Sequence, residues 1–166
     1  MSVEILDAYR PGAIGAITEM HARYYSAHWG FGLFFEAMVA TELAAFLSRY
    51  DDATDRFWMA VSGDEIVGSL VVDGGEPEAA ELGAHLRLFF VDEALHGKGI
   101  GRDLMQRAVA FCDDHGYKRS YLTTFEGLDE ARRLYERFGY RLVKEDMDST
   151  WGVRVKEQLL ERLRPG

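Results

Sequence analysis

Apolar and polar residues alternate along this chain with two different periods, and each change of period marks a new element. Four segments repeat apolar residues every three or four positions, as a helix with one buried face does. They are Ala13–His28, the apolar series Phe35–Tyr50, Ile100–His115 and Asp129–Phe138. The third of these places Cys112 on its apolar face, where we expect a buried structural thiol.

Seven other segments are predicted as strands, because β-branched and aromatic residues gather there in short runs between turn residues. In chain order they are Val3–Tyr9, Arg56–Val61, Ile66–Asp73, Ala84–Val91, Arg119–Phe125, Tyr140–Glu145 and Val153–Leu163. The last segment, Val153–Leu163, is predicted either as the final strand or as a helix at the end of this segment. The order β-α-α-β-β-β-α-β-α-β-β predicts an α/β domain whose first half is antiparallel.

Three glycines at alternate positions separate the strand Ala84–Val91 from the helix Ile100–His115: Gly97, Gly99 and Gly101. Glycines allow a backbone to turn tightly and to approach a ligand closely. A helix that begins at such a loop directs unpaired N–H groups and its positive dipole end at one point, which favours a phosphate or pyrophosphate. The spacing fits neither a P-loop nor the Gly-x-Gly-x-x-Gly of dinucleotide-binding folds, and a turn without a ligand is the simplest alternative.

Composition narrows the class of protein. A length of 166 residues, with 48% apolar and 28% charged residues, is typical of one globular domain, which we expect to span residues 1–166. The chain has neither a long apolar run nor a signal-peptide pattern, so we expect no membrane segment and a cytoplasmic location. Its single cysteine excludes an internal disulfide and a multi-thiolate metal site, and we expect no metal.

The formal net charge of −9 argues against nucleic acid as a partner, since phosphate binding needs clustered Lys and Arg. It favours a cationic substrate such as an amine, although an acidic surface also serves solubility alone.

A second motif follows the glycine loop. Ala131, Tyr135, Gly139 and Tyr140 have the spacing Ala-x-x-x-Tyr-x-x-x-Gly-Tyr. Together with the loop His96–Gly101, this motif makes the chain resemble the GNAT superfamily of acyl-CoA-dependent N-acetyltransferases. That superfamily carries Arg/Gln-x-x-Gly-x-Gly/Ala in the loop and Ala-x-x-x-Tyr-x-x-x-Gly-Phe/Tyr after it.

The resemblance covers Ala84–Glu145 and implies a GNAT-type fold. In that fold a mixed, mostly antiparallel sheet has helices on both faces and is splayed between its fourth and fifth strands. The aromatic N-terminal helices and the segment Ala27–Gly30 also resemble the acetyltransferase half of MarR–GNAT fusion proteins, whose DNA-binding domain has no counterpart in this sequence.

The resemblance also implies a reaction, in which a substrate amine attacks the thioester of acetyl-CoA directly. The pyrophosphate would lie on the backbone amides of Gly97–Gly101, and the pantetheine arm would pair with the strand edge at Phe89–Val91. Lys98 and Arg102 could contact the phosphates, although a solvated charge is an equal alternative for each. The residues implied for cofactor binding are Phe89, Phe90, Val91, His96, Gly97, Lys98, Gly99, Ile100, Gly101 and Arg102.

Two proton transfers accompany this reaction. Tyr135 matches the family's general acid for the leaving thiolate, whereas its pattern alone would indicate core packing. An alkylammonium is almost fully protonated at neutral pH, so the amine needs a base or a desolvating pocket. His85 and Glu81 are the candidates for this base. The alternatives are that both are ordinary surface residues, or that a chain of water molecules takes the proton. His21 and His28 follow the aromatic face of the first helix, where we expect buried structural histidines, with a part in the substrate wall as the alternative.

Two residues depart from the family pattern. His96 replaces the usual Arg or Gln, and Leu128 replaces an Asn that often contacts the cofactor. A non-catalytic acyl-CoA-binding module is therefore the alternative function, and a dinucleotide-binding enzyme is a more distant one. The acceptor is expected to be a small-molecule or peptide amine. The aromatic residues Tyr24, Tyr25, Trp29, Phe31, Phe34 and Phe35 indicate either a partly apolar acceptor or a homodimer contact.

Overall fold

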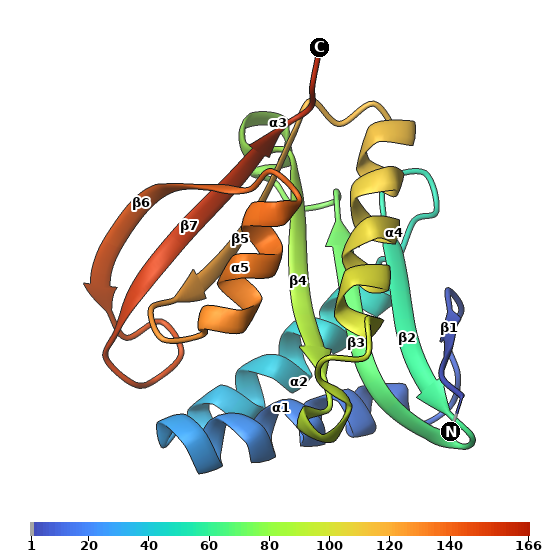
Figure 1. Cartoon of the computed structure of the whole chain (residues 1–166), viewed down its shortest axis with the longest axis vertical. Coiled ribbons are helices and arrows are strands. Elements are labelled where there is room, and N and C mark those ends of the chain that lie inside the picture. The colour runs from blue at the N-terminus through green and yellow to red at the C-terminus, as the bar shows by residue number, and fades with distance from the viewer. Residues whose placement is uncertain (1) are drawn as a thin grey trace.

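The computed structural model describes residues 2–166, in which one mixed sheet is flanked by helices on both faces (Figure 1). The spatial strand order is β1-β2-β3-β4-β5-β7-β6, and every neighbouring pair is antiparallel except β4 and β5. The strands are β1 (Glu4–Leu6), β2 (Arg56–Ser62), β3 (Glu65–Asp73), β4 (Ala84–Val91), β5 (Arg119–Phe125), β6 (Arg141–Asp148) and β7 (Val155–Leu163). The helices are α1 (Ala13–Trp29), α2 (Leu33–Ser48), α3 (Ala79–Leu82), α4 (Ile100–Asp114) and α5 (Asp129–Arg137).

The two faces of the sheet carry separate cores because side chains alternate along each strand. On β2, Phe57 and Met59 pack against α1 and α2, while Trp58 and Ala60 pack against α4 on the opposite face. This double burial explains why β2 and β3 are nearly continuous apolar runs rather than alternating ones.

β4 and β5 diverge after a short contact. They pair in parallel only at Ala84 with Ser120 and at His85 with Tyr121, and then separate along their length (Figure 1). β5 pairs over its whole length with β7, so the far half of β4 has a free edge on this side. The predicted splay between the fourth and fifth strands is confirmed.

A β-bulge lies in the free half of β4. Leu88 and Phe89 together face one residue of β3, Leu70, and Leu88 has a left-handed φ of 55°. Such a backbone costs about 1–3 kcal/mol in a non-glycine residue and persists only where neighbours hold it. The hydroxyl of Ser69 does so by donating a 2.7 Å hydrogen bond to the Leu88 carbonyl oxygen.

The predicted elements are all present, with some different bounds. β1 is only Glu4–Leu6, shorter than the predicted Val3–Tyr9, whereas β6 extends to Asp148. The last segment is a strand and not a helix. The sequence patterns missed α3 and the 3₁₀ turn Glu93–Leu95, because both are too short for an apolar periodicity. Within residues 2–166, no helix has the length and apolar character needed to cross a membrane.

Candidate active site

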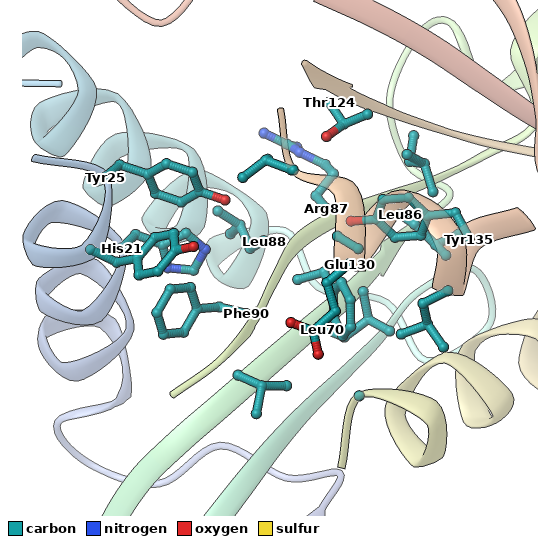
Figure 2. A pocket seen from close by; sticks show the side chains of 18 of the residues that line it. His21, Tyr25, Leu70, Leu86, Arg87, Leu88, Phe90, Thr124, Glu130 and Tyr135 are labelled. Carbon is teal, nitrogen blue, oxygen red and sulfur yellow. The ribbon is translucent and has the colours of Figure 1, made fainter. Parts of the chain in front are cut away.

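A cavity of about 1120 Å³ opens where β4 and β5 diverge. Its walls come from α1, α2, β4, β5, α5 and the loop between β4 and α4 (Figure 2). The cavity therefore collects residues that are more than 100 positions apart, such as His21 and Tyr135. It is lined by most of the residues singled out in the sequence.

The glycine loop forms one end of the cavity. Gly97 and Gly99 adopt left-handed φ values of 80° and 83°, and Gly99 precedes α4 without any side-chain cap. A Cβ on either glycine would meet no atom within 4 Å, so the space in front of these amides is open. A Cβ on Gly101 would come within 3.3 Å of Leu134 and of Phe89, so this glycine permits close packing. The arrangement leaves the first N–H groups of α4 without side-chain caps beside the cavity.

The flanking loop residues divide between two surfaces. His96, Ile100 and Arg102 line the main cavity. Lys98 instead lines a smaller recess together with Asp103 on the side of β1. The structure thus brings together every predicted cofactor-binding residue except Lys98.

His96 connects the glycine loop to β4 and to α5. Its Nε2 donates a 2.8 Å hydrogen bond to the carbonyl oxygen of Val91 at the end of β4, and its Nδ1 lies 3.4 Å from Glu130 Oε2 on α5. A histidine at this position therefore links β4, the loop and α5. Leu128 precedes α5 and provides no side-chain cap to it.

Tyr135 faces the cavity from α5 (Figure 2). Its ring lies 5.9 Å from the ring of Phe89, and the residue is only 8% exposed. No hydrogen bond contributes to its pKa, which reflects burial and the nearby Tyr25 and Tyr140. Burial raises its pKa above the ordinary value of 10.0, so the hydroxyl remains protonated at neutral pH.

A second tyrosine enters from the opposite wall. Tyr25 on α1 lies across the cavity from Tyr135 (Figure 2), and burial raises its pKa as well. Most of the predicted aromatic group lines this wall: Tyr24, Tyr25, Trp29, Phe31 and Phe35. Phe34 does not line it and is 61% exposed, with its ring against Gly152.

His85 lines the cavity beside the point where the strands diverge. Its Nδ1 lies 2.7 Å from Glu76 Oε1, and its ring stacks on Tyr121 at 4.3 Å with an interplanar angle of 15°. The Tyr121 hydroxyl also donates to Glu76 Oε1, at 3.3 Å. Glu76 was not predicted from the sequence, because it precedes Pro77 in a loop and belongs to no motif.

Glu81, the other predicted base, lies elsewhere. It belongs to α3, where its main-chain oxygen accepts a hydrogen bond from Arg119, and its side chain is not part of the cavity wall. The short helix that the sequence patterns missed accounts for this, because α3 and the Gly83 turn separate Glu81 from β4.

A buried ionic network supports the floor of the cavity. Asp73 is fully buried and accepts two hydrogen bonds from Arg49, at 2.9 and 2.7 Å, and one from Arg87, at 2.9 Å. Burial alone would raise the pKa of Asp73. Hydrogen bonds from Arg49, from the Gly75 backbone and from Arg87, together with the charge of Arg49, lower it. Arg87 also pairs with Glu42 of α2 at 2.8 Å, so β4 and α2 are tied together at this end.

The two histidines of α1 differ from each other. His21 is 4% exposed and donates from Nδ1 to the carbonyl oxygen of Ile17 at 2.8 Å. Burial lowers its pKa to about 4, so it is a neutral, buried histidine as predicted. The prediction that His28 is buried was wrong: its side chain is 44% exposed, lies 3.1 Å from Glu93 and, like that of His21, lines the cavity. Among the described residues, no group of three His, Cys, Asp or Glu side chains could hold a metal ion.

Comparison with known proteins identifies the family. A family model described as the acetyltransferase (GNAT) family matches residues 14–140. N-acetylaspartate synthetase of Danio rerio is 30% identical over 145 residues, which are 87% of this chain and 50% of that protein. Spermine/spermidine N(1)-acetyltransferase of Bacillus subtilis is 37% identical over 70 residues, or 42% of this chain and 46% of that protein.

Solved structures show the same fold. A GNAT-family acetyltransferase from Staphylococcus aureus Mu50 has a TM-score of 0.76 at 18% identity, covering 99% of this chain and 100% of that chain. The yncA structure from Salmonella typhimurium, solved with its cofactor acetyl-CoA, has a TM-score of 0.76 at 15% identity and covers 99% of this chain and 95% of that one.

This chain belongs to the acetyltransferase (GNAT) family. The predicted resemblance and the GNAT-type mixed sheet are both confirmed. The chain spans about half the length of the N-acetylaspartate synthetase that it matches. The finer likeness to the acetyltransferase half of MarR–GNAT fusions stays a prediction.

Proposed function

We propose that this chain is an N-acetyltransferase that transfers the acetyl group of acetyl-CoA directly to a primary amine of a small molecule or peptide. The observation that carries the proposal is a single cavity that holds three features. These are a glycine-led helix N-terminus, the free edge of β4, and the protonated hydroxyl of Tyr135. Each of them suits one part of the reaction.

The glycine loop suits the pyrophosphate of acetyl-CoA. The residues proposed to hold it are Gly97, Gly99, Ile100 and Gly101 through their backbone amides, with Arg102 nearby. Open space in front of Gly97 and Gly99 leaves room for phosphate oxygens against these amides. The fit is electrostatic as well, since the N-terminus of α4 carries partial positive charge.

The free edge of β4 suits the pantetheine arm, whose amides can pair with a strand as an added strand does. β5 leaves β4 after His85, so Phe89, Phe90 and Val91 have no neighbouring strand on that side. In this position the arm would run along the cavity from the glycine loop toward the point where the strands diverge.

The reaction needs two groups that handle protons. A substrate ammonium gives up one proton to become a nucleophile, and its nitrogen then forms a bond to the acetyl carbon while the carbon–sulfur bond breaks. Tyr135 would give its proton to the leaving sulfur and recover one from the acylated nitrogen, so that one proton is released overall. His85 is the proposed base, because it lines the cavity whereas Glu81 does not.

Acceptors with an apolar body are favoured by the aromatic wall on α1 and α2, and the acidic surface attracts amines. A thiol-release assay with acetyl-CoA and a panel of amines tests the proposal. The panel should include aspartate and spermidine, for which two relatives are named, and arylalkylamines. Turnover that is lost in Tyr135→Phe supports it. Tight acetyl-CoA binding without turnover on any amine would instead indicate the alternative, a non-catalytic acyl-CoA-binding module.

A further inference from the structure

Glu76 occupies a fixed position although it lies in a loop. The two residues before it are held by acidic side chains: Gly74 N donates to Asp55 Oδ1 at 2.9 Å, and Gly75 N donates to Asp73 Oδ1 at 3.1 Å. Gly74 is also packed tightly, because a Cβ there would lie within 3 Å of the Tyr117 hydroxyl and of the Thr54 carbonyl oxygen. The backbone that carries Glu76 is therefore anchored on several sides.

The Glu76 carboxylate in turn determines which nitrogen of His85 carries hydrogen. A carboxylate only accepts hydrogen bonds, so the 2.7 Å contact requires a hydrogen on Nδ1 of His85. In the neutral ring, Nε2 then has a free lone pair. His85 lines the cavity, and its side chain is 15% exposed.

We propose that Glu76 is a positioning residue, which holds His85 in the Nδ1–H tautomer so that Nε2 can take the proton of the acceptor amine. This inference rests on the proposed function. Stacking on Tyr121 fixes the plane of the ring, and the hydrogen bond to Glu76 fixes its rotation within that plane. The protonated ring that forms during catalysis would face a carboxylate, which stabilises it.

The surrounding charges agree with an ionised Glu76. Burial alone would raise the pKa of Glu76, but the hydrogen bond and charge of His85, together with the charge of Arg87, lower it. Arg87 Nη1 lies 3.6 Å from Glu76 Oε2, and the Tyr121 hydroxyl donates to Oε1. The charge of Asp73, which also faces this cluster, raises the pKa of Glu76, but Asp73 is itself paired with Arg87.

The test compares Glu76→Gln with Glu78→Gln, which removes the same charge from an exposed residue two positions away. Glu76→Gln should lower kcat by about 10- to 100-fold, a part of the 10²–10⁴ that a general base contributes, with the KM for acetyl-CoA unchanged. Glu78→Gln should match the wild type, and Glu76→Asp should recover part of the rate. A Glu76→Gln enzyme with kcat within twofold of wild type would overturn the inference.

A second measurement does not depend on turnover. Nitrogen-15 NMR of the five histidines, with His85 assigned from a His85→Gln variant, reports the tautomer directly. We expect Nδ1–H in the wild type and a mixture in Glu76→Ala; an Nε2–H wild type would refute the positioning role whatever the activity. Full activity in His85→Gln, with activity lost in Tyr135→Phe, would refute the base and leave the transferase intact. No turnover by the wild type on any amine would refute the proposed function itself.

Discussion

Replacing Tyr135 with phenylalanine removes one oxygen atom from the cavity wall and leaves the ring against Phe89 in place. The substitution keeps the buried ring, and no hydrogen bond contributes to the pKa of the hydroxyl that it removes. We therefore expect the free energy of unfolding to change by no more than about 0.5 kcal/mol.

The effect on activity should be far larger. A positioned general acid contributes about 10²–10⁴-fold to a rate, so kcat of Tyr135→Phe should fall by about that factor while the KM for acetyl-CoA remains similar. Burial raises the pKa of Tyr135 above 10.0, so wild-type kcat should show no loss from tyrosine ionisation between about pH 7 and pH 9.

The assay is thiol release at saturating acetyl-CoA and amine, with thermal unfolding measured on the same samples. Tyr9→Phe, at a residue that is 59% exposed, is the matched control and should behave as the wild type. A folded Tyr135→Phe enzyme with kcat within threefold of wild type would refute the reasoning, since protonation of the leaving sulfur would then not depend on this hydroxyl.

Three further predictions concern binding and stability. Gly99→Ala should weaken acetyl-CoA binding by about tenfold in calorimetry, because alanine at a φ of 83° costs about 1–2 kcal/mol although its Cβ has open space; unchanged affinity would contradict the loop's role. Asp73→Asn should lower the free energy of unfolding by about 3–5 kcal/mol in urea, because it removes the buried carboxylate that accepts hydrogen bonds from both Arg49 and Arg87, and a loss below 1 kcal/mol would contradict this. The pKa of His21 falls from 6.5 to about 4 on folding, so the unfolded chain binds more protons between these pH values. The wild type should therefore lose up to about 3 kcal/mol more than His21→Phe as the pH falls from 7 to 4, and parallel losses would refute it.

Some of the residues that line the cavity follow from local sequence patterns. The glycine loop is the six-residue motif His96–Gly101, and Tyr135 belongs to the ten-residue motif Ala131–Tyr140. α4 and α5 can likewise be predicted from their own apolar periodicity. Gly97 and Gly99 line the cavity, and their place between a predicted strand and a predicted helix was the reason to expect a phosphate site there.

The features that the sequence did not predict depend on distant contacts. Asp73 meets Arg49 from 24 residues away, and each residue alone has the pattern of a surface charge. Glu81 lies closer in sequence to His85 than Glu76 does, but α3 places Glu81 away from the cavity. The loop before α3 instead places Glu76 Oε1 2.7 Å from His85 Nδ1. The bulge at Leu88 arises from pairing with β3, which no local propensity encodes.

The cavity between β4 and β5 is proposed to bind acetyl-CoA with the pyrophosphate on the glycine loop. A crystal structure of the protein with coenzyme A tests this most directly. We predict the pyrophosphate on the amides of Gly97–Gly101, the pantetheine arm along Phe89–Val91, and the sulfur within hydrogen-bonding reach of the Tyr135 hydroxyl. Coenzyme A bound outside this cavity, or with its sulfur remote from Tyr135, would contradict the account.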